Sequence, residues 1–202
     1  MDGGNLAQTL EKTTGWTIIN LREATMETTR AIVLRKTRLT ETSLIVSWLT
    51  ESHGRLKTVA RGVRKAKGAF AGQIDLFYLC EIGWRQSGKS DLHGLVEARL
   101  VEPHAAIREH YLRLLFASYA AELVEMATEP EHPALELFDL LRRALGYLQV
   151  NHPSRKALVF FEQEICRATG ILPENGEGFA RELMRHFQRL PDSRRELLET
   201  LR

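Results

Sequence analysis

The amino-acid sequence predicts an α+β protein, in which a five-stranded β-barrel of the OB type is followed by an all-α helical bundle. Short β-prone runs separated by turn residues fill positions 31–101, and apolar residues recur at spacings of three and four after position 103. Charge also changes sign: positions 26–101 hold thirteen basic and seven acidic residues, whereas 102–149 hold four and eight. We therefore expect an N-terminal extension at 1–25, a barrel domain at 26–102 and a helical domain at 103–202.

The first 25 residues show no sustained hydrophobic period, and Met26 comes just before the first strand-like run. Two interpretations stay open: Met26 is the true start of the protein, or residues 1–25 are an ordinary extension that packs on the body. No function is assigned to this segment.

Five β-prone runs are expected to form the barrel, at positions 31–34, 43–49, 55–60, 76–84 and 92–101. The connection at 62–75 is longer and could hold one helical turn around 70–72. Strands of this number and spacing are typical of a small barrel or sandwich. In an OB-type barrel, the inter-strand loops and an exposed strand face bind oligonucleotides.

Helical patterns dominate the second half of the chain. An apolar stripe at 112–126 predicts a central, mostly buried helix. Pro133 can open a second helix that runs to about Val150, and Pro153 a third that ends at Gly170. Two more are expected at 175–190 and after the capping-box pattern of Ser193 and Glu196.

Basic side chains are concentrated after Gly54, and no Asp or Glu occurs between positions 52 and 74. The alternation of a strand places Arg55, Lys57 and Arg61 on one face, and a basic loop follows. Nucleic acid is the commonest partner of such a surface, because each neutralised phosphate releases counterions. The candidate DNA-binding residues are Arg35, Lys36, Arg38, Arg55, Lys57, Arg61, Arg64, Lys65 and Lys67, with Phe70 as a stacking contact.

Two other functions fit parts of the sequence. The segment from Gly83 to Ser90 has the spacing of a phosphate-binding P-loop, in which Lys89 would contact phosphate and Ser90 magnesium in a nucleotide hydrolase. That chemistry needs a helix at Lys89, but positions 91–96 have the pattern of a strand, so a hairpin turn explains the same residues. Alternatively, the basic barrel docks an acidic protein partner, which charge alone does not distinguish from DNA binding.

Metal-ligand spacing is absent from the sequence. The seven histidines are scattered, with no pair at the helical spacing of four. Glu122 and Glu125 could bind a metal or act as an acid–base pair, but a solvated helix edge is the expected role. Cys80 and Cys166 alone build neither a disulfide scaffold nor a multi-cysteine zinc site. We expect a cytoplasmic protein without metal, cofactor or membrane span.

Several segments together resemble the RecO recombination mediators of bacteria. The segments are AIVLR at 31–35, ETSLIV at 41–46, HGRLK at 53–57 and VARGVRK at 59–65, with further support at 70–72, 100–103 and 117–123. The resemblance covers roughly positions 29–173. It implies an OB-fold joined to a helical domain, in a non-enzymatic protein of recombinational repair.

Partners also follow from this resemblance. Such proteins bind single- and double-stranded DNA, anneal complementary strands and, with RecR, help load RecA recombinase onto strands coated by single-strand-binding protein. The acidic, apolar C-terminal tail of single-strand-binding protein binds the helical domain, which requires an apolar groove beside a cation. By charge, Arg142, Arg143 and Arg155 are the candidates.

The sequence departs from the family pattern at one place. Many members carry a four-cysteine zinc module after the Gly-Ile-Leu-Pro position, but residues 170–181 contain no cysteine. The sequence therefore predicts a helical domain without the zinc module, and it leaves the fold after Pro173 open.

Overall fold

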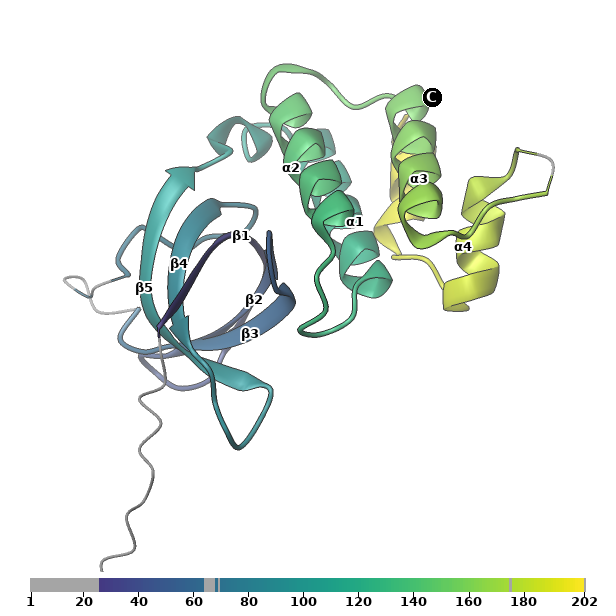
Figure 1. Cartoon of the computed structure of the whole chain (residues 1–202). Coiled ribbons are helices and arrows are strands. Elements are labelled where there is room, and N and C mark those ends of the chain that lie inside the picture. Colours follow the sequence, from purple (N-terminus) through teal and green to yellow (C-terminus); the bar gives the residue numbers. More distant parts are fainter. Residues whose placement is uncertain (1–25, 64–67, 69, 175, 202) are drawn as a thin grey trace, which may run out of the picture.

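The computed structural model describes residues 26–63, 68, 70–174 and 176–201. The two interpretations of residues 1–25 lie outside the described residues. Strands come first along the chain and helices follow, and the two parts lie side by side (Figure 1). The predicted α+β class is therefore confirmed.

Five strands form a closed barrel in the order β1-β2-β3-β5-β4, which is the arrangement of an OB-type barrel. Neighbouring strands are antiparallel except β3 and β5, which pair in parallel at Lys57 and Leu92. The strands are β1 (Glu27–Arg38), β2 (Leu44–Thr50), β3 (Gly54–Ala60), β4 (Leu79–Arg85) and β5 (Leu92–Glu102).

Strand β1 is longer than the sequence predicts, and it closes the barrel. Its first half pairs with β4 and its second half with β2. A β-bulge interrupts the second pairing, because Val33 faces Trp48 but Arg35 faces Ser47. Leu34 is the extra residue, and the bulge turns Arg35 outward beside Ser47.

Within the described residues, the helical part contains a short 3-10 helix and five α-helices. Local chemistry fixes both ends of the helix at Arg155–Thr169. The Ser154 hydroxyl accepts a 3.1 Å hydrogen bond from the Ala157 N–H at its start, and Gly170 ends the helix at φ 73°. The predicted capping box is wrong, because Asp192 holds the N-cap position and Ser193 lies inside the last helix. The elements are η1 (Ala105–Ile107), α1 (Tyr111–Ala127), α2 (Leu135–Val150), α3 (Arg155–Thr169), α4 (Phe179–Phe187) and α5 (Ser193–Thr200).

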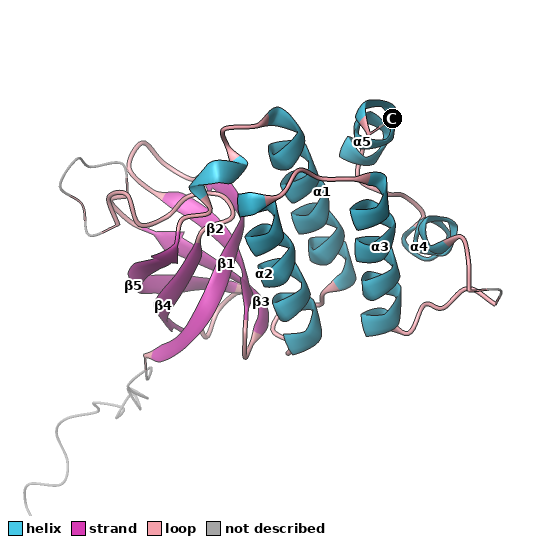
Figure 2. Cartoon of the chain, turned by 90° about the horizontal axis from the view of Figure 1, so that it is seen from above, coloured by secondary structure: helices cyan, strands magenta, loops and turns pink. Residues whose placement is uncertain are grey.

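Two hydrophobic clusters hold the molecule together. One fills the barrel around Trp48, Leu56 and Trp84. The other joins the outer surface of the barrel, at Ile32 and Leu49, to the helices. Helices α1 and α2 therefore lie against the outside of the barrel, as the view from above shows (Figure 2).

Candidate nucleic-acid interface

Beside the helices, the outer surface of β1, β2 and β3 carries three of the candidate DNA-binding cations, Arg35, Lys57 and Arg61. The strand register places Arg35 opposite Ser47, and Ser47 opposite Lys57. In the next row, Ile45 pairs with Val59, and both are partly exposed. We call this surface the β1–β3 face, formed by Arg35, Ile45, Ser47, Lys57, Val59 and Arg61.

The predicted alternation along β3 is confirmed. Leu56, Thr58 and Ala60 point into the barrel and are no more than 1% exposed. Lys57 lies between them in sequence and is exposed, as is Arg61 just beyond the strand. A cation on an exposed strand face can approach a phosphate without loss of barrel packing.

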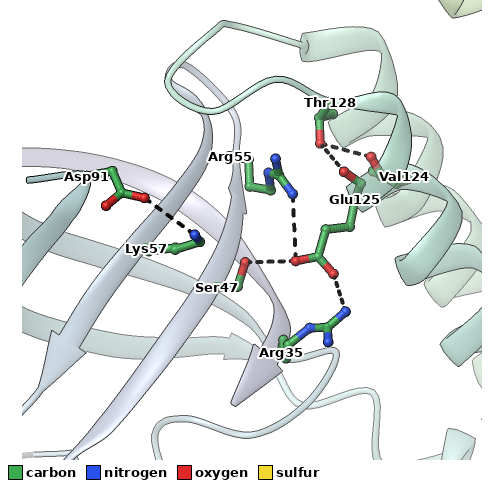
Figure 3. Close-up of polar contacts among 8 residues, drawn as sticks. All are labelled: Arg35, Ser47, Arg55, Lys57, Asp91, Val124, Glu125 and Thr128. Atoms are coloured by element: carbon green, nitrogen blue, oxygen red, sulfur yellow. Dashed lines mark hydrogen bonds and ion pairs between the residues drawn. The ribbon is translucent and has the colours of Figure 1, made fainter. Parts of the chain in front are cut away.

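Carboxylates neutralise much of this face. Lys57 Nζ lies 3.4 Å from Asp91 Oδ2, and Arg35 Nη2 lies 2.8 Å from Glu125 Oε2 (Figure 3). Among the described residues, Arg61 forms no ion pair. Of the three basic side chains on the β1–β3 face, Arg61 is therefore the one whose charge is most available to a ligand.

Glu125 on α1 connects the helices to the barrel. Its carboxylate accepts hydrogen bonds from Arg35 at 2.8 Å and from the Ser47 hydroxyl at 3.4 Å, and it lies 3.8 Å from Arg55. The hydrogen bond and the charge of Glu125 raise the pKa of Arg35, so this arginine stays cationic. The expected solvated edge is wrong for Glu125, whose side chain is 16% exposed. Glu122, three residues earlier, is exposed.

Arg55 belongs to the contact between barrel and helices rather than to an open ribbon. Its side chain is 21% exposed, and its Nε atom is buried without a hydrogen-bond partner. Its carbonyl accepts a 3.0 Å hydrogen bond from the Glu131 N–H in the α1–α2 connection. The expectation of a freely solvated Arg55 is therefore corrected, because the helices cover this end of β3.

The second basic patch is divided between two environments. Lys36 pairs with Asp75, which also binds Arg108, so this lysine is tied to the segment before β4. Arg38 is exposed and pairs with Glu41 in the β1–β2 loop. These pairs leave Lys36 and Arg38 less available to phosphate than charge alone indicates.

Phe70 is not a stacking surface. It is only 5% exposed and packs in the barrel cluster, in a turn where its carbonyl accepts a 3.1 Å hydrogen bond from the Gln73 N–H. The prediction is wrong because the connection before β4 turns its aromatic side chain inward. Arg64, Lys65 and Lys67 lie outside the described residues.

The P-loop-like segment is a hairpin. It begins in β4 at Gly83, leaves the strand after Arg85 and leads into β5 at Leu92, with no helix at Lys89. The Ser90 hydroxyl donates a 3.4 Å hydrogen bond to the Leu92 carbonyl of the same turn. A phosphate cradle needs the amides of a helix N-terminus, so the structure contradicts the nucleotide-hydrolase alternative.

The helical part contains an apolar groove of about 410 Å³ between α1, α2 and α3. Phe160 is 51% exposed in its lining, and Tyr147 is 40% exposed. Two cations, Arg143 and Lys156, line the same groove. We call this the α2–α3 groove.

The three arginines proposed from the sequence as partner-binding residues differ in their position relative to this groove. Arg142 and Arg143 both hydrogen-bond Asp139 at 2.8 Å, but only Arg143 lines the groove. Arg155 is exposed and does not line it. Sequence reasoning missed Lys156 and Phe160; the signal available was an aromatic residue directly before the buried stripe residue Phe161.

Within the described ranges, no three His, Cys, Asp or Glu side chains gather where they could hold a metal ion. No helix there is both long and apolar enough to cross a bilayer.

The closed barrel, its cationic outer face and the packed helices define a protein of the OB-barrel class with a helical domain attached. Two family models match the chain in succession: Recombination protein O N terminal at residues 25–104 and Recombination protein O C terminal at residues 108–176. The chain belongs to the RecO family.

Curated relatives agree with this membership. The DNA repair protein RecO of Rhodopirellula baltica is 34% identical over 143 residues, which are 71% of this chain and 53% of the relative. That of Anaeromyxobacter dehalogenans strain 2CP-C is 36% identical over 142 residues, 70% of this chain and 56% of the relative. The Bacillus pumilus protein of the same name is 32% identical over 143 residues, 71% of this chain and 55% of the relative. The chain spans about half the length of the curated relatives it matches.

Proposed function

We propose that this protein is a non-enzymatic, DNA-binding member of the recombinational repair machinery. It binds single- and double-stranded DNA, anneals complementary strands and helps to load recombinase onto protein-coated single strands. The observation that carries the proposal is the exposed pair Lys57 and Arg61 on the β1–β3 face of an OB-type barrel, in a chain of the RecO family. Among the described residues, this face offers cations and aliphatic surface but no stacked aromatic platform.

Phosphate contacts of this type hold a strand without reading its bases. Lys57 and Arg61 would contact the backbone, and Ile45 and Val59 supply aliphatic surface beside it. We therefore expect weak sequence preference and strong salt dependence. If about four to six cations engage a single strand, log K falls against log salt with a slope of about −3 to −4.

Fluorescence anisotropy of a labelled single-stranded oligonucleotide across a salt series tests this proposal. The double variant Lys57→Ala, Arg61→Ala should bind more weakly than wild type, and its salt slope should be about 1.4 smaller in magnitude. Arg55 is left intact, because its role in the domain contact would confuse folding with binding. The control is Arg99→Ala, which removes an exposed cation that pairs with Glu81 on the β4–β5 side.

Unchanged binding in the double variant would reject the β1–β3 face as the DNA site. In that case, an acidic protein that binds wild type but not the double variant would favour the alternative of a protein-docking barrel. Annealing of complementary strands, measured by fluorescence quenching, should fall in the same variant. This second readout separates strand annealing from simple binding.

The α2–α3 groove is the proposed site for the C-terminal tail of single-strand-binding protein. Its aromatic lining suits an apolar terminal side chain, and Arg143 and Lys156 suit acidic groups. A labelled acidic peptide with a C-terminal phenylalanine should bind wild type and lose affinity in Phe160→Ala and Arg143→Ala. Arg142→Ala is the matched control, since Arg142 shares Asp139 but lies outside the groove.

RecR is the proposed direct protein partner, and RecA the recombinase that is loaded indirectly. These two proposals rest on membership of the family. A pull-down with purified RecR, followed by a RecA-loading assay on coated single strands, tests both.

A further inference from the structure

A cleft of about 610 Å³ lies where the β1–β3 face meets the helices. Arg35 and Arg55 line it from the barrel, Glu122 and Glu125 from α1, and Arg189 from the connection between α4 and α5. The cleft is continuous with the proposed DNA face, because Arg35 and Lys57 both flank Ser47 in the strand register.

Glu125 places an oxyanion between the two barrel arginines (Figure 3). The fit is uneven: one oxygen lies 2.8 Å from Arg35, whereas the other lies 3.8 Å from Arg55. Arg55 Nε is buried and has no acceptor. Arg55 therefore holds more donor capacity than the carboxylate satisfies.

A phosphodiester matches this unused capacity. It carries the same single negative charge as a carboxylate, and its non-bridging oxygens suit the forked donors of arginine. Arg189 adds a further cation on the opposite wall; it is exposed and forms no ion pair within the part of the chain that the structure describes.

We propose that this cleft is a phosphate position on the nucleic-acid path, in which a backbone phosphate of a bound strand replaces Glu125 between Arg35 and Arg55. The proposal rests on the DNA-binding function above and extends the path from the barrel onto the helical side. Glu125 then acts as an internal competitor: it holds the helices against the barrel in the free protein and lowers the affinity for DNA.

The substitution Glu125→Gln tests the competition. Glutamine keeps an acceptor for the Ser47 hydroxyl but removes the charge, so Arg35 and Arg55 become available to phosphate. In low salt, we expect this variant to bind a single-stranded oligonucleotide about two- to fivefold more tightly than wild type, the range that one ion pair near the protein surface supplies. The salt slope should also become steeper.

The matched control is Glu122→Gln, which makes the same change of charge on an exposed side chain of the same cleft. Glu122 forms no ion pair with either barrel arginine. The affinity of the Glu122→Gln variant for the oligonucleotide should therefore rise by less than about twofold. Equal gains in the two variants, or no gain in Glu125→Gln, would overturn the inference.

A second variant keeps the test decisive if Glu125→Gln folds poorly. Arg189→Ala should weaken binding by about two- to threefold, whereas Arg185→Ala, an exposed α4 cation paired with Glu182 outside the cleft, should not. If wild type binds DNA through Lys57 and Arg61 but substitutions at Glu125 and Arg189 do not change the affinity, the cleft is rejected as a phosphate position while the proposed function stands. Absence of DNA binding by wild type would reject the proposed function, and this inference with it.

Discussion

The phenol of Tyr119 on α1 donates a 2.7 Å hydrogen bond to the buried carboxylate of Glu162 on α3. Arg194 on α5 donates to the same carboxylate at 2.6 Å, so one acidic side chain joins three helices. Glu162 is only 2% exposed. Burial, followed by the negative charge of Glu162, raises the pKa of Tyr119 far above its ordinary value, which keeps the phenol a donor.

Glu162→Ala should lower the free energy of unfolding by about 3 kcal/mol, because it leaves a partly buried arginine without its counter-ion. Tyr119→Phe removes one hydrogen bond but keeps the ion pair, and it should cost about 1 kcal/mol. Urea denaturation of both variants measures the difference. Similar losses in the two variants would show that the Glu162–Arg194 pair contributes little.

Gly54 is the position in β3 where a side chain is least tolerable. Its φ is +63°, and an added Cβ would lie 1.8 Å from the carbonyl oxygen of His132. Gly62 has a similar φ of +73° but open space around it. Gly62→Ala should therefore cost about 1 kcal/mol from backbone strain, and Gly54→Ala should cost clearly more.

Thermal unfolding of the two glycine variants provides the comparison. The melting temperature of Gly54→Ala should fall well below that of Gly62→Ala, because the first change also separates the α1–α2 connection from the barrel. Equal melting temperatures would mean that the connection moves away at no cost.

Asp75 should make stability depend on pH in the acid range. Burial alone would raise its pKa, but hydrogen bonds from Lys36, the Leu76 N–H and Arg108 outweigh burial and hold the pKa below the ordinary value of 3.8. The unfolded chain therefore binds the proton more tightly than the folded one. The stabilisation is present above about pH 4 and is lost as pH falls through the folded pKa.

Urea unfolding of wild type and Asp75→Asn between about pH 6 and pH 2 tests this expectation. Wild type should be the more stable protein near neutrality, and the difference should shrink as the solution becomes acidic. A difference that stays constant over this range would refute the assignment to Asp75.

Both cysteines should be unreactive in the folded protein. Burial raises the pKa of the Cys80 thiol to about 12, and burial with nearby Glu162 and Glu182 raises that of Cys166 to about 11. The thiolate is the reactive form, so a thiol reagent at about pH 8 should modify neither cysteine until the protein is unfolded in urea. Rapid native labelling of Cys80 would indicate that the barrel opens at β4.

The sequence predicts much of the fold because its patterns are local. Alternation along β3 requires only that Leu56 and Ala60 prefer the interior, and the stripe through α1 requires only helical geometry. The ends of β1 are harder to predict from the sequence, since the polar residues at 27–30 and 35–38 lack alternation. They belong to the strand only because β4 and β2 pair with them.

The errors at the candidate site have a common physical cause. Arg55 and Lys57 share the same strand parity, and only the long-range packing of α1 decides that Arg55 is largely covered beside Glu125, whereas Lys57, paired with Asp91, stays exposed. Glu125 likewise has the sequence pattern of a solvated helix residue, and only the packing of α1 on the barrel makes it the partner of Arg35 and Arg55. Phe70 follows a basic segment, but the barrel interior offers it more apolar contact than solvent does.

The bulge in β1 gives backbone register a direct influence on the proposed DNA face. Because Leu34 is the extra residue, Arg35 lies outward beside Ser47, and Lys36, opposite the buried Val46, reaches Asp75 instead. Without the bulge, Leu34 itself would pair with Ser47, and Arg35 would lie opposite Val46 with its side chain toward the barrel interior. An aliphatic side chain would then replace the forked guanidinium beside Glu125. A change in the register of β1 would therefore alter the chemistry of the surface, even when every basic residue is retained.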